Sequence, residues 1–410
     1  SIDSRTGHLQ DIVNETSETF IDYSQKTMIH WLDQSNDLVW ASERDGWNHL
    51  YRFDATTGKQ INQITKGEWV VRRIEHVDED RGIIWFAAMG IYPDQDPYHV
   101  HLARINLDGT NLVILTEGDG THQWEFNADR SLFVDRWSRV DLPERAQLRE
   151  AKDGAVVADL FTQDISELQR QNFTLPIRFA SVGRDNQTMI YGTLIRPSTF
   201  NPENSYPVIE HIYAGPHDFH VRKQFGSHVS QRRLAELGFV VVQIDGMGTN
   251  WRSKKFHDVC WKNLADAGLP DRIAWIKAAA KQYPWIDLSR VGIYGGSAGG
   301  QNALAAVLHH GDFYKAAASD CGCHDNRMDK IWWNEAWMGK LGPHYKQNSN
   351  VTHADKLRGN LFLTVGELDT NVDPASTLQV VDALIQNKKD FEFLLVPNGG
   401  HGVGESDYLF

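Results

Sequence analysis

The sequence predicts two parts of different fold class: a β-propeller arrangement of short strands over residues 1–165, and an α/β domain with a mostly parallel sheet over residues 172–410. Three observations support this division. Turn sequences recur at nearly constant spacing in the first part, apolar strands alternate with helices in the second, and a serine there lies among four glycines. A chain of 410 residues is also longer than one ordinary core requires, so two domains are expected.

In the first part, apolar and polar residues alternate around turns rich in aspartate and glycine, which is the pattern of antiparallel strands. Four of these turns end at Gly7, Gly58, Gly109 and Gly154, at intervals of 51, 51 and 45 residues. A repeat of roughly 40–50 residues with about four strands per unit is typical of propeller blades. An irregular antiparallel sandwich is the alternative, and the repeat makes us favour blades.

The number of repeats predicts about three to four blades. Propellers close with about 4–8 blades, so we expect residues 1–165 to form an open arc, with further blades upstream of this sequence. Open strand edges invite pairing with another chain. We therefore expect another polypeptide to cap the arc, either a different protein or a second copy that gives a homodimer.

In the second part, nearly continuous apolar strands alternate with helical segments, which indicates a parallel sheet covered on both faces. Residues 179–197 are expected to form an opening hairpin. The strands expected after it are residues 208–213, 239–244, 291–294, 361–365 and 391–396. The expected helices lie near residues 230–237 and 272–281, and begin at Ala298 and at Pro374.

The serine with four glycine neighbours is Ser297, between an expected strand and an expected helix. Residues 295–299 read Gly-Gly-Ser-Ala-Gly and fit G-x-S-x-G, the nucleophile elbow. This turn is so sharp that side chains two positions either side of the serine would collide with the neighbouring strand and helix, so glycine is needed there. Phosphate-binding loops require a lysine or a different glycine spacing. An inert glycine-rich turn is the less favoured alternative.

An elbow serine requires an acid and then a histidine later in the chain. Asp369 and His401 each follow an expected strand, and loops at the carboxyl ends of parallel strands are where functional groups gather. Glu367 and Asp373 compete for the acid position, although Asp373 is better explained as a helix N-cap. His401 would take the proton of Ser297 as it attacks a carbonyl, and Asp369 would hold the imidazole in the required tautomer.

The oxyanion formed by that attack needs hydrogen-bond donors, each worth roughly 3–4 kcal/mol of barrier. The backbone N–H of Ala298 is the first candidate, because it follows the nucleophile directly. The second donor is expected in the loop after the strand at residues 208–213, which begins Tyr213-Ala214-Gly215-Pro216.

Four motifs together resemble the prolyl oligopeptidase family of serine peptidases, most closely its dipeptidyl peptidase IV-like branch: GGSAGG, YAGP after a strand, LDTNV and GGHG. The resemblance covers essentially the whole chain, because members join a β-propeller to a C-terminal α/β-hydrolase domain. It implies Ser297 as nucleophile, Asp369 as orienting acid and His401 as base. It further implies an oxyanion hole made of the Tyr213 hydroxyl and the Ala298 N–H, and we expect no cofactor.

The resemblance also implies substrate contacts. Asn371 resembles the asparagine that holds a substrate carbonyl, and Trp333 falls where the branch has an aromatic wall around the residue before the scissile bond. Asp329 stands where the branch usually has an aromatic residue, and Cys323 is expected close to the same pocket. The implied activity is dipeptidyl-aminopeptidase cleavage of short peptides, with proline preference left open. The branch binds the free amino terminus with a pair of glutamates, and no Glu-Glu pair occurs in this sequence.

Composition excludes several other classes. The net charge of −13 argues against nucleic acid as a partner. No apolar run approaches the ~20 residues of a membrane span. The stretch DCGCHD, residues 320–325, lacks the second ligand pair of a zinc site, so no metal is expected. The residues leave the compartment open, and the resemblance slightly favours the periplasm or the extracellular space.

Two alternative functions remain open from the sequence. A carboxylesterase or other acyl hydrolase would use the same three residues on ester substrates. A propeller is also a common interaction platform, so a binding module with an inactive hydrolase domain is the third interpretation.

Overall fold

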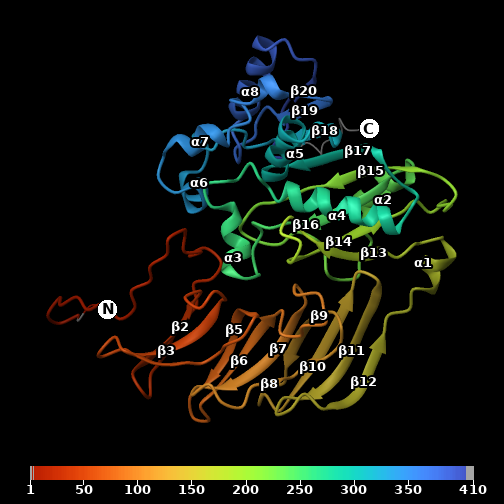
Figure 1. The fold of residues 1–410 in the computed structure, drawn as a ribbon. Helices are drawn as coiled ribbons and strands as arrows, with labels where there is room; N and C mark the ends of the chain where they lie inside the picture. Colours follow the sequence, from red (N-terminus) through yellow and green to blue (C-terminus); the bar gives the residue numbers. More distant parts are fainter. Residues whose placement is uncertain (1, 3, 403–410) are drawn as a thin grey trace. The chain divides into compact units, whose positions relative to one another are not determined.

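The computed structural model describes residue 2 and residues 4–402, and the chain forms two compact units (Figure 1). The first unit comprises Ser1–Ile165, Arg222–Gly226 and Trp251–Asp258, and the second comprises Ser166–Val221, Ser227–Asn250 and Val259–Phe410. Within the described part of the chain, no helix has the length and apolar character needed to cross a membrane.

Three four-stranded antiparallel sheets form the described part of the first unit, and they confirm the predicted propeller blades (Figure 1). The first blade contains β1 (Ile29–Leu32), β2 (Asp37–Ser42), β3 (His49–Asp54) and β4 (Gln60–Gln63). The second contains β5 (Val70–Asp78), β6 (Ile83–Met89), β7 (Val100–Asn106) and β8 (Val113–Ile114). The third contains β9 (Thr121–Phe126), β10 (Leu132–Arg139), β11 (Leu142–Glu150) and β12 (Val156–Thr162).

The glycine of each blade's last turn has a steric role. Gly58, Gly109 and Gly154 have φ of 71°, 86° and 78°, the left-handed region that favours glycine. A Cβ on Gly109 would lie 2.9 Å from the carbonyl oxygen of Gln63 in the preceding blade, and one on Gly154 would lie 2.4 Å from that of Leu115. The turns at Gly109 and Gly154 pack against the backbone at the end of the preceding blade, and the turn at Gly58 packs against the backbone of Asp11 and Ile12, which precede the first blade.

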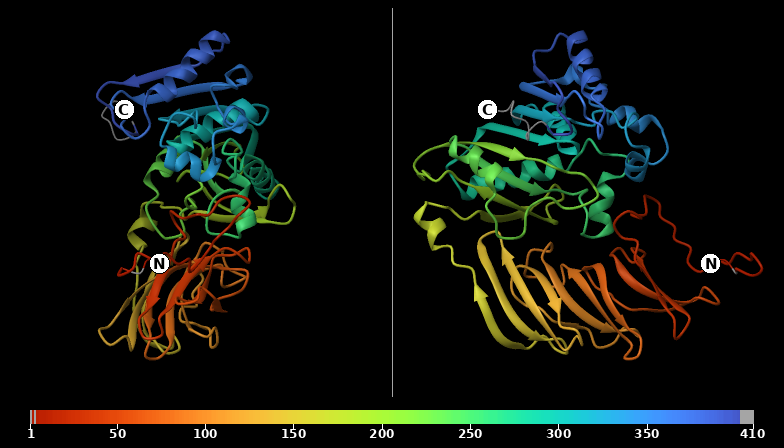
Figure 2. Two further views of the ribbon diagram at one scale, coloured as in Figure 1. Left: turned by 90° about the vertical axis from the view of Figure 1, so that its left-hand side faces the viewer. Right: turned by 180° about the vertical axis from the view of Figure 1, so that it is seen from behind.

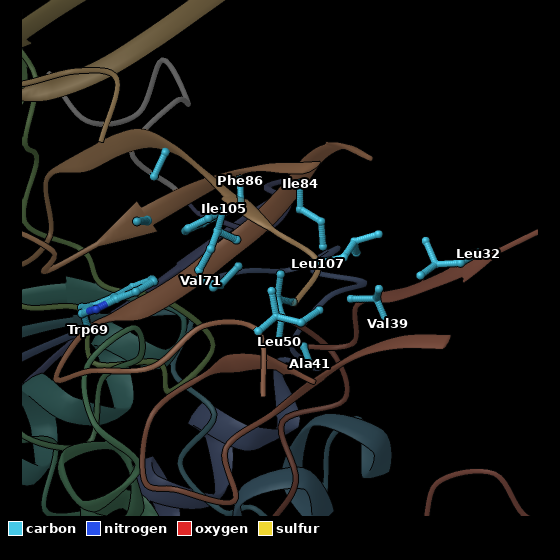
Figure 3. Packing of buried hydrophobic residues seen from close by; sticks show 13 residues of the cluster. Leu32, Val39, Ala41, Leu50, Trp69, Val71, Ile84, Phe86, Ile105 and Leu107 are labelled. Carbon is cyan, nitrogen blue, oxygen red and sulfur yellow. The ribbon is translucent and has the colours of Figure 1, made fainter. Parts of the chain in front are cut away.

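Apolar side chains from neighbouring blades share a core. In the cluster of Figure 3, Leu32, Val39 and Leu50 of the first blade pack with Ile84 and Phe86 of the second, and each of the five is at most 1% exposed. Complete burial of such a side chain stabilises the fold by about 1.5–3 kcal/mol. A second cluster joins the second and third blades through Trp85, Leu102, Leu115, Phe133 and Ala151.

The strand at the end of the third blade has an unpaired edge. Among the described strands, β12 pairs only with β11, and all seven of its residues are exposed. Four of them are large and apolar, with exposed fractions of 45–51%: Val156, Val157, Leu160 and Phe161. The blades form an open arc that ends at β12, as the number of repeats predicts (Figure 2).

The second unit is built on one eight-stranded sheet with the order β13-β14-β16-β15-β17-β18-β19-β20. The hairpin of β13 (Ile177–Val182) and β14 (Met189–Ile195) is antiparallel, and all neighbours from β16 to β20 are parallel. The other strands are β15 (Tyr206–His211), β16 (Val240–Asp245), β17 (Ile286–Gly296), β18 (Tyr314–Asp320), β19 (Asn360–Gly366) and β20 (Glu392–Val396). The mostly parallel sheet predicted from the apolar strands is therefore confirmed.

Helices alternate with these strands along the chain, although the short helix Lys254–His257 belongs to the first unit. The α-helices are α1 (Ser166–Arg170), α2 (Val229–Glu236), α3 (Lys254–His257), α4 (Leu269–Gln282), α5 (Ala298–His309), α6 (Ile331–Met338), α7 (Pro343–Gln347) and α8 (Ala375–Gln386). Two short 3₁₀-helices are η1 (Asp258–Cys260) and η2 (Ala354–Lys356). Helix α5 packs against β17 and β18, and eleven of its twelve residues are buried. This deep burial fixes the start of α5 relative to the sheet.

Some boundaries differ from those expected. Helix α4 begins at Leu269, three residues before the expected start, because Pro270 occupies its first turn, where a missing N–H costs nothing. Helix α8 begins at Ala375 with Pro374 just before it. The short helices α6 and α7 lie in a stretch of sequence without clear periodicity, and only the structure reveals them.

Candidate active site

Ser297 lies between the end of β17 and the start of α5. Its backbone adopts φ 59° and ψ −124°, a conformation that residues other than glycine rarely take. The Ser297 N–H donates to the carbonyl oxygen of Asp320 at 2.9 Å, which supports this strained turn from the neighbouring strand β18. Strain of about 1–3 kcal/mol persists only where the surroundings enforce it, and such positions concentrate at functional sites.

Three of the four glycines around Ser297 are required by space. A Cβ on Gly295 or Gly299 would lie 2.5 or 2.4 Å from the carbonyl oxygen of Ile212, and one on Gly300 would lie 2.3 Å from a carbonyl oxygen at the end of β18. A Cβ on Gly296 would meet nothing closer than 3.7 Å, which is ordinary contact. The backbone of the elbow therefore approaches β15 and β18 more closely than any side chain would permit.

His401 and Asp369 form a hydrogen-bonded pair. His401 Nδ1 lies 2.8 Å from Asp369 Oδ2, and the Asp369 side chain is fully buried. The other carboxylate oxygen, Oδ1, accepts from the backbone N–H groups of Asn371 at 2.8 Å and Val372 at 2.9 Å. These fixed donors orient the carboxylate toward the imidazole. With Nδ1 donating to Asp369, Nε2 of the neutral ring is left as a proton acceptor.

The two competing acids have other partners. Glu367 Oε2 accepts from the backbone N–H of Asn398 at 3.1 Å. Asp373 Oδ1 accepts from the N–H of Ala375 at 2.8 Å, at the start of α8, so it caps that helix. Both carboxylates stabilise the loops that carry Asp369 and His401.

Cys321 lies between the elbow and the His401–Asp369 pair. The residue before it, Asp320, accepts the Ser297 N–H through its carbonyl oxygen. Donor atoms of Cys321, Asp369 and His401 all lie within 4.8 Å of one another. The loops after β17, β18, β19 and β20 therefore converge at this point.

The cluster of Cys321, Asp369 and His401 offers a metal ion poor ligands. Burial and, secondarily, the nearby Asp320 raise the pKa of the Cys321 thiol to about 12, so it stays protonated at neutral pH. The Asp369 carboxylate already has hydrogen-bond partners on both oxygens. His324, from the stretch DCGCHD, is completely buried elsewhere, and burial lowers its pKa to about 3.

Tyr213 follows β15 by two residues and reaches the elbow. Tyr213 and Ser297 line one small cavity, and burial raises the pKa of the Tyr213 hydroxyl above its usual value. The phenol therefore remains a neutral donor. Its ring contacts the rings of His220, at 4.5 Å between centroids, and His217, at 5.9 Å. Sequence reasoning missed these two histidines because neither follows a strand directly.

One cavity of about 150 Å³ contains most of the predicted site residues. It is lined by Tyr213, Ser297, Ala298, Cys323, Asp329, Lys330, Trp332, Trp333, Asn371 and Val372. Seven of these ten were expected at the site, and the backbone of Asn371 and Val372 ties the cavity to Asp369. Lys330, Trp332 and Val372 were missed, although each is a sequence neighbour of a residue that was named.

A second and larger cavity has a different character. It has a volume of about 900 Å³ and lies over β17 to β20, where its lining includes Ile293, Leu361 and Phe391. None of the expected site residues lines it. The larger volume therefore does not mark the active site, and the expected site residues place it in the smaller cavity.

Together, the three blades, the eight-stranded sheet and the serine at the strand–helix turn define a protein that joins a β-propeller unit to an α/β-hydrolase unit. Sequence models agree with this class. Residues 1–144 match the dipeptidyl peptidase IV N-terminal region, and residues 226–409 match the prolyl oligopeptidase family. Both matches support a protein of the prolyl oligopeptidase family with a dipeptidyl peptidase IV-like N-terminal region.

Similar proteins extend over nearly the whole chain. The probable dipeptidyl-aminopeptidase B of Aspergillus oryzae is 27% identical over 425 residues, which cover 98% of this chain and 46% of that protein. The corresponding protein of Neosartorya fischeri is 28% identical over 422 residues, which cover 98% of this chain and 45% of that protein. The chain thus spans somewhat less than half the length of these relatives.

Two crystal structures share the fold. A putative dipeptidyl aminopeptidase IV from Bacteroides ovatus superposes with a TM-score of 0.80 at 23% identity, covering 92% of this chain and 56% of that one. Porphyromonas gingivalis dipeptidyl peptidase 4 superposes with a TM-score of 0.81 at 23% identity, covering 94% and 54%. The fold class predicted from the sequence is thereby confirmed.

The glycine contacts predict different effects for two substitutions at the elbow. We expect Gly299→Ala to destabilise the protein by about 1–3 kcal/mol, because its Cβ would displace the Ile212 carbonyl that precedes Tyr213. Gly296→Ala is the matched control and should change the free energy of unfolding by less than about 0.5 kcal/mol. Denaturant unfolding of both variants measures the difference, and equal stabilities would contradict the steric interpretation.

Proposed function

We propose that this protein is a serine peptidase that acts on short peptides as a dipeptidyl-aminopeptidase. The observation that carries the proposal is the position of Ser297, which is held at a strained turn and lines the small cavity together with Tyr213. Its N–H bonds the carbonyl oxygen of Asp320, the residue before Cys321, and donor atoms of Cys321, Asp369 and His401 lie within 4.8 Å of one another. The similar proteins are named dipeptidyl-aminopeptidase and dipeptidyl peptidase, and these names support the release of two residues at a time from a peptide.

The proposed reaction begins with Ser297. His401 Nε2 accepts the hydroxyl proton while Oγ attacks the carbonyl carbon of the scissile bond. The negative charge that forms on the carbonyl oxygen is stabilised by the Tyr213 hydroxyl and by the Ala298 N–H, which lies at the positive end of α5. The C–N bond then breaks, the leaving amine takes the proton from His401, and an acyl group remains on Ser297. Water then attacks the acyl carbon while His401 accepts a proton from it, the C–O bond to Ser297 breaks, and His401 returns the proton to Ser297 Oγ as the product acid leaves.

Asp369 acts through His401. Its buried carboxylate accepts from Nδ1 and keeps Nε2 free for the serine proton, and it stabilises the imidazolium that forms during attack. Because backbone N–H groups hold its other oxygen, the carboxylate has little freedom to rotate away.

Residues of the small cavity bind the substrate in this proposal. Trp333 supplies an aromatic wall around the side chain before the scissile bond, and Asn371 holds a substrate carbonyl. Cys323 and Asp329 line the same space. A cavity of about 150 Å³ beside the nucleophile suits one side chain of a short peptide.

The proposal includes a partner at the open edge of the arc. Unpaired N–H and C=O groups on an edge strand pair readily with another chain, and β12 combines such an edge with four exposed apolar side chains. A second polypeptide, which in the simplest case is another copy, adds a strand there.

Substitution of the proposed catalytic residues tests the activity. Ser297→Ala should abolish both labelling by a fluorophosphonate and hydrolysis of dipeptidyl amides, with folding intact because the glycines maintain the elbow.

Asp369→Asn should lower kcat by on the order of 10⁴ through the wrong imidazole tautomer, while Asp373→Asn, the matched control, should keep most of the activity. If the wild-type protein cleaves short acyl esters and no peptide amide, it is an acyl hydrolase; if it takes no label, the binding interpretation replaces ours.

Tyr213→Phe removes one hydroxyl from the site. We expect kcat to fall by roughly 10²–10³ with little change in KM, because the hydroxyl would act on the developing oxyanion and not on the bound substrate. Steady-state kinetics on one amide substrate distinguishes the two parameters. An effect confined to KM would make Tyr213 a binding residue instead.

The edge partner predicts an effect of charge on β12. If the protein self-associates, Val157→Lys should shift it toward the monomer, because a lysine on an edge strand disfavours strand pairing. Leu237→Lys, at a side chain that is 73% exposed in the other unit, is the control and should leave association unchanged. Sedimentation measures both variants, and a wild-type protein that stays monomeric at high concentration would remove self-association from the proposal.

A further inference from the structure

A carboxylate lines the small cavity beside Ser297. Asp329 stands two residues before α6, and its side chain is only 10% exposed. Burial of a carboxylate is costly unless a cation or hydrogen-bond donors compensate it. The partners of Asp329 therefore indicate what the cavity is suited to bind.

The protein itself compensates Asp329 weakly. Lys330 Nζ lies 3.2 Å from Asp329 Oδ1. It is the next residue in the sequence, its side chain is 30% exposed, and it also donates to the backbone carbonyl oxygen of Asn371. The Cys323 side chain lines the same cavity. An ionised carboxylate accepts about four hydrogen bonds, so Asp329 retains capacity for a ligand.

The remaining walls of the cavity suit a cation. Tyr213, Trp332 and Trp333 line it with aromatic rings. Aromatic faces attract ammonium and guanidinium groups, most strongly where water is excluded. A carboxylate surrounded by aromatic rings thus favours a positively charged group with an apolar stem.

A buried polar network holds the back of the cavity in place. Asn326 donates to Asn334 Oδ1 at 2.8 Å and contacts the Cys323 sulfur at 3.6 Å, and Gln301 donates to Asn326 at 2.9 Å. Asn326, Asn334 and Gln301 are each at most 3% exposed. Since Cys323 lines the cavity together with Asp329, this network gives the cavity that contains the carboxylate a rigid polar support.

We propose that Asp329 makes this cavity the site for a lysine or arginine side chain at the residue whose carbonyl Ser297 attacks. This inference rests on the proposed peptidase function and names its substrate class: peptides whose second residue is basic. The substrate cation bonds the free lone pairs of Asp329, its methylene stem lies along Trp333, and Lys330 turns toward solvent. A proline ring in the same place would bury the carboxylate without supplying a donor.

The test compares dipeptidyl coumarin amides that differ only in the second residue: Ala-Lys, Ala-norleucine and Ala-Pro. Norleucine matches the lysine stem without its charge. We expect kcat/KM for Ala-Lys to exceed that for Ala-norleucine by roughly 10- to 100-fold, the range for a hydrogen bond to a charged group. Asp329→Asn should remove most of this ratio, and Lys330→Met should increase it, because the competing cation is gone.

Two controls separate specificity from folding and from chemistry. Glu335→Gln removes an exposed carboxylate from α6, outside the cavity, and should leave the ratio unchanged. Fluorophosphonate labelling of the Asp329→Asn protein should match the wild type, since Ser297 and its neighbours are untouched. Loss of labelling would mean that the Asp329→Asn protein has lost its lysine preference because it is misfolded. In that case Asp329→Glu, which keeps the charge, decides the question, and the inference stands only if this variant retains the lysine preference.

Other outcomes overturn the inference. Suppose that the wild-type protein reacts with the fluorophosphonate in a separate sample and cleaves after norleucine or proline as well as, or better than, after lysine. That result would refute the basic-residue site while leaving the peptidase function intact. A lysine preference that survives Asp329→Asn would refute the role of Asp329. Faster cleavage of a coumarin amide that carries a single alanine with a free amino group than of the Ala-Lys amide would mean that the Asp329 carboxylate binds the amino terminus of the substrate instead. A wild-type protein without labelling or turnover would remove the proposed function and this inference together.

Discussion

The carbonyl oxygen of Ile212 lies so close to Gly295 and Gly299 that neither residue has room for a Cβ. The geometry of the site depends on this backbone contact. The contact brings the strand before Ser297 and the helix after it against the end of β15. Because Tyr213 is the next residue after Ile212, the same contact sets the distance between the serine and its tyrosine neighbour. A side chain at either glycine would separate the two groups, so the spacing of donor and nucleophile is fixed by backbone packing.

Parallel register extends this constraint to the rest of the site. Strands β15, β17, β18, β19 and β20 are neighbours with the same direction, so their carboxyl ends meet at one edge of the sheet. The loops that follow these five strands carry Tyr213, Ser297, Cys321, Asp369 and His401, respectively. Residues more than a hundred positions apart therefore converge without any local sequence signal of their proximity.

The sequence predicted features with a strong local cause. The turns at Gly58, Gly109 and Gly154 recur because each packs closely on backbone that precedes its blade, and three of the four elbow glycines are required because side chains do not fit. The lining of the small cavity was only partly predictable. Lys330 and Trp332 belong to a stretch without apolar periodicity, and their position depends on tertiary packing of the loop between β18 and α6 and of α6 itself.

The site contains two aspartates in opposite situations, and the difference separates their roles. Asp369 is fully buried, and both of its oxygens have partners within the protein, one of them His401. Asp329 is nearly as buried, yet its charged partner is a neighbouring lysine that is partly solvated. A carboxylate satisfied by the fold holds a fixed orientation and suits a positioning role. A carboxylate left partly unsatisfied beside the nucleophile gains most from a cation that arrives with the substrate, so catalysis and specificity are assigned to different acids.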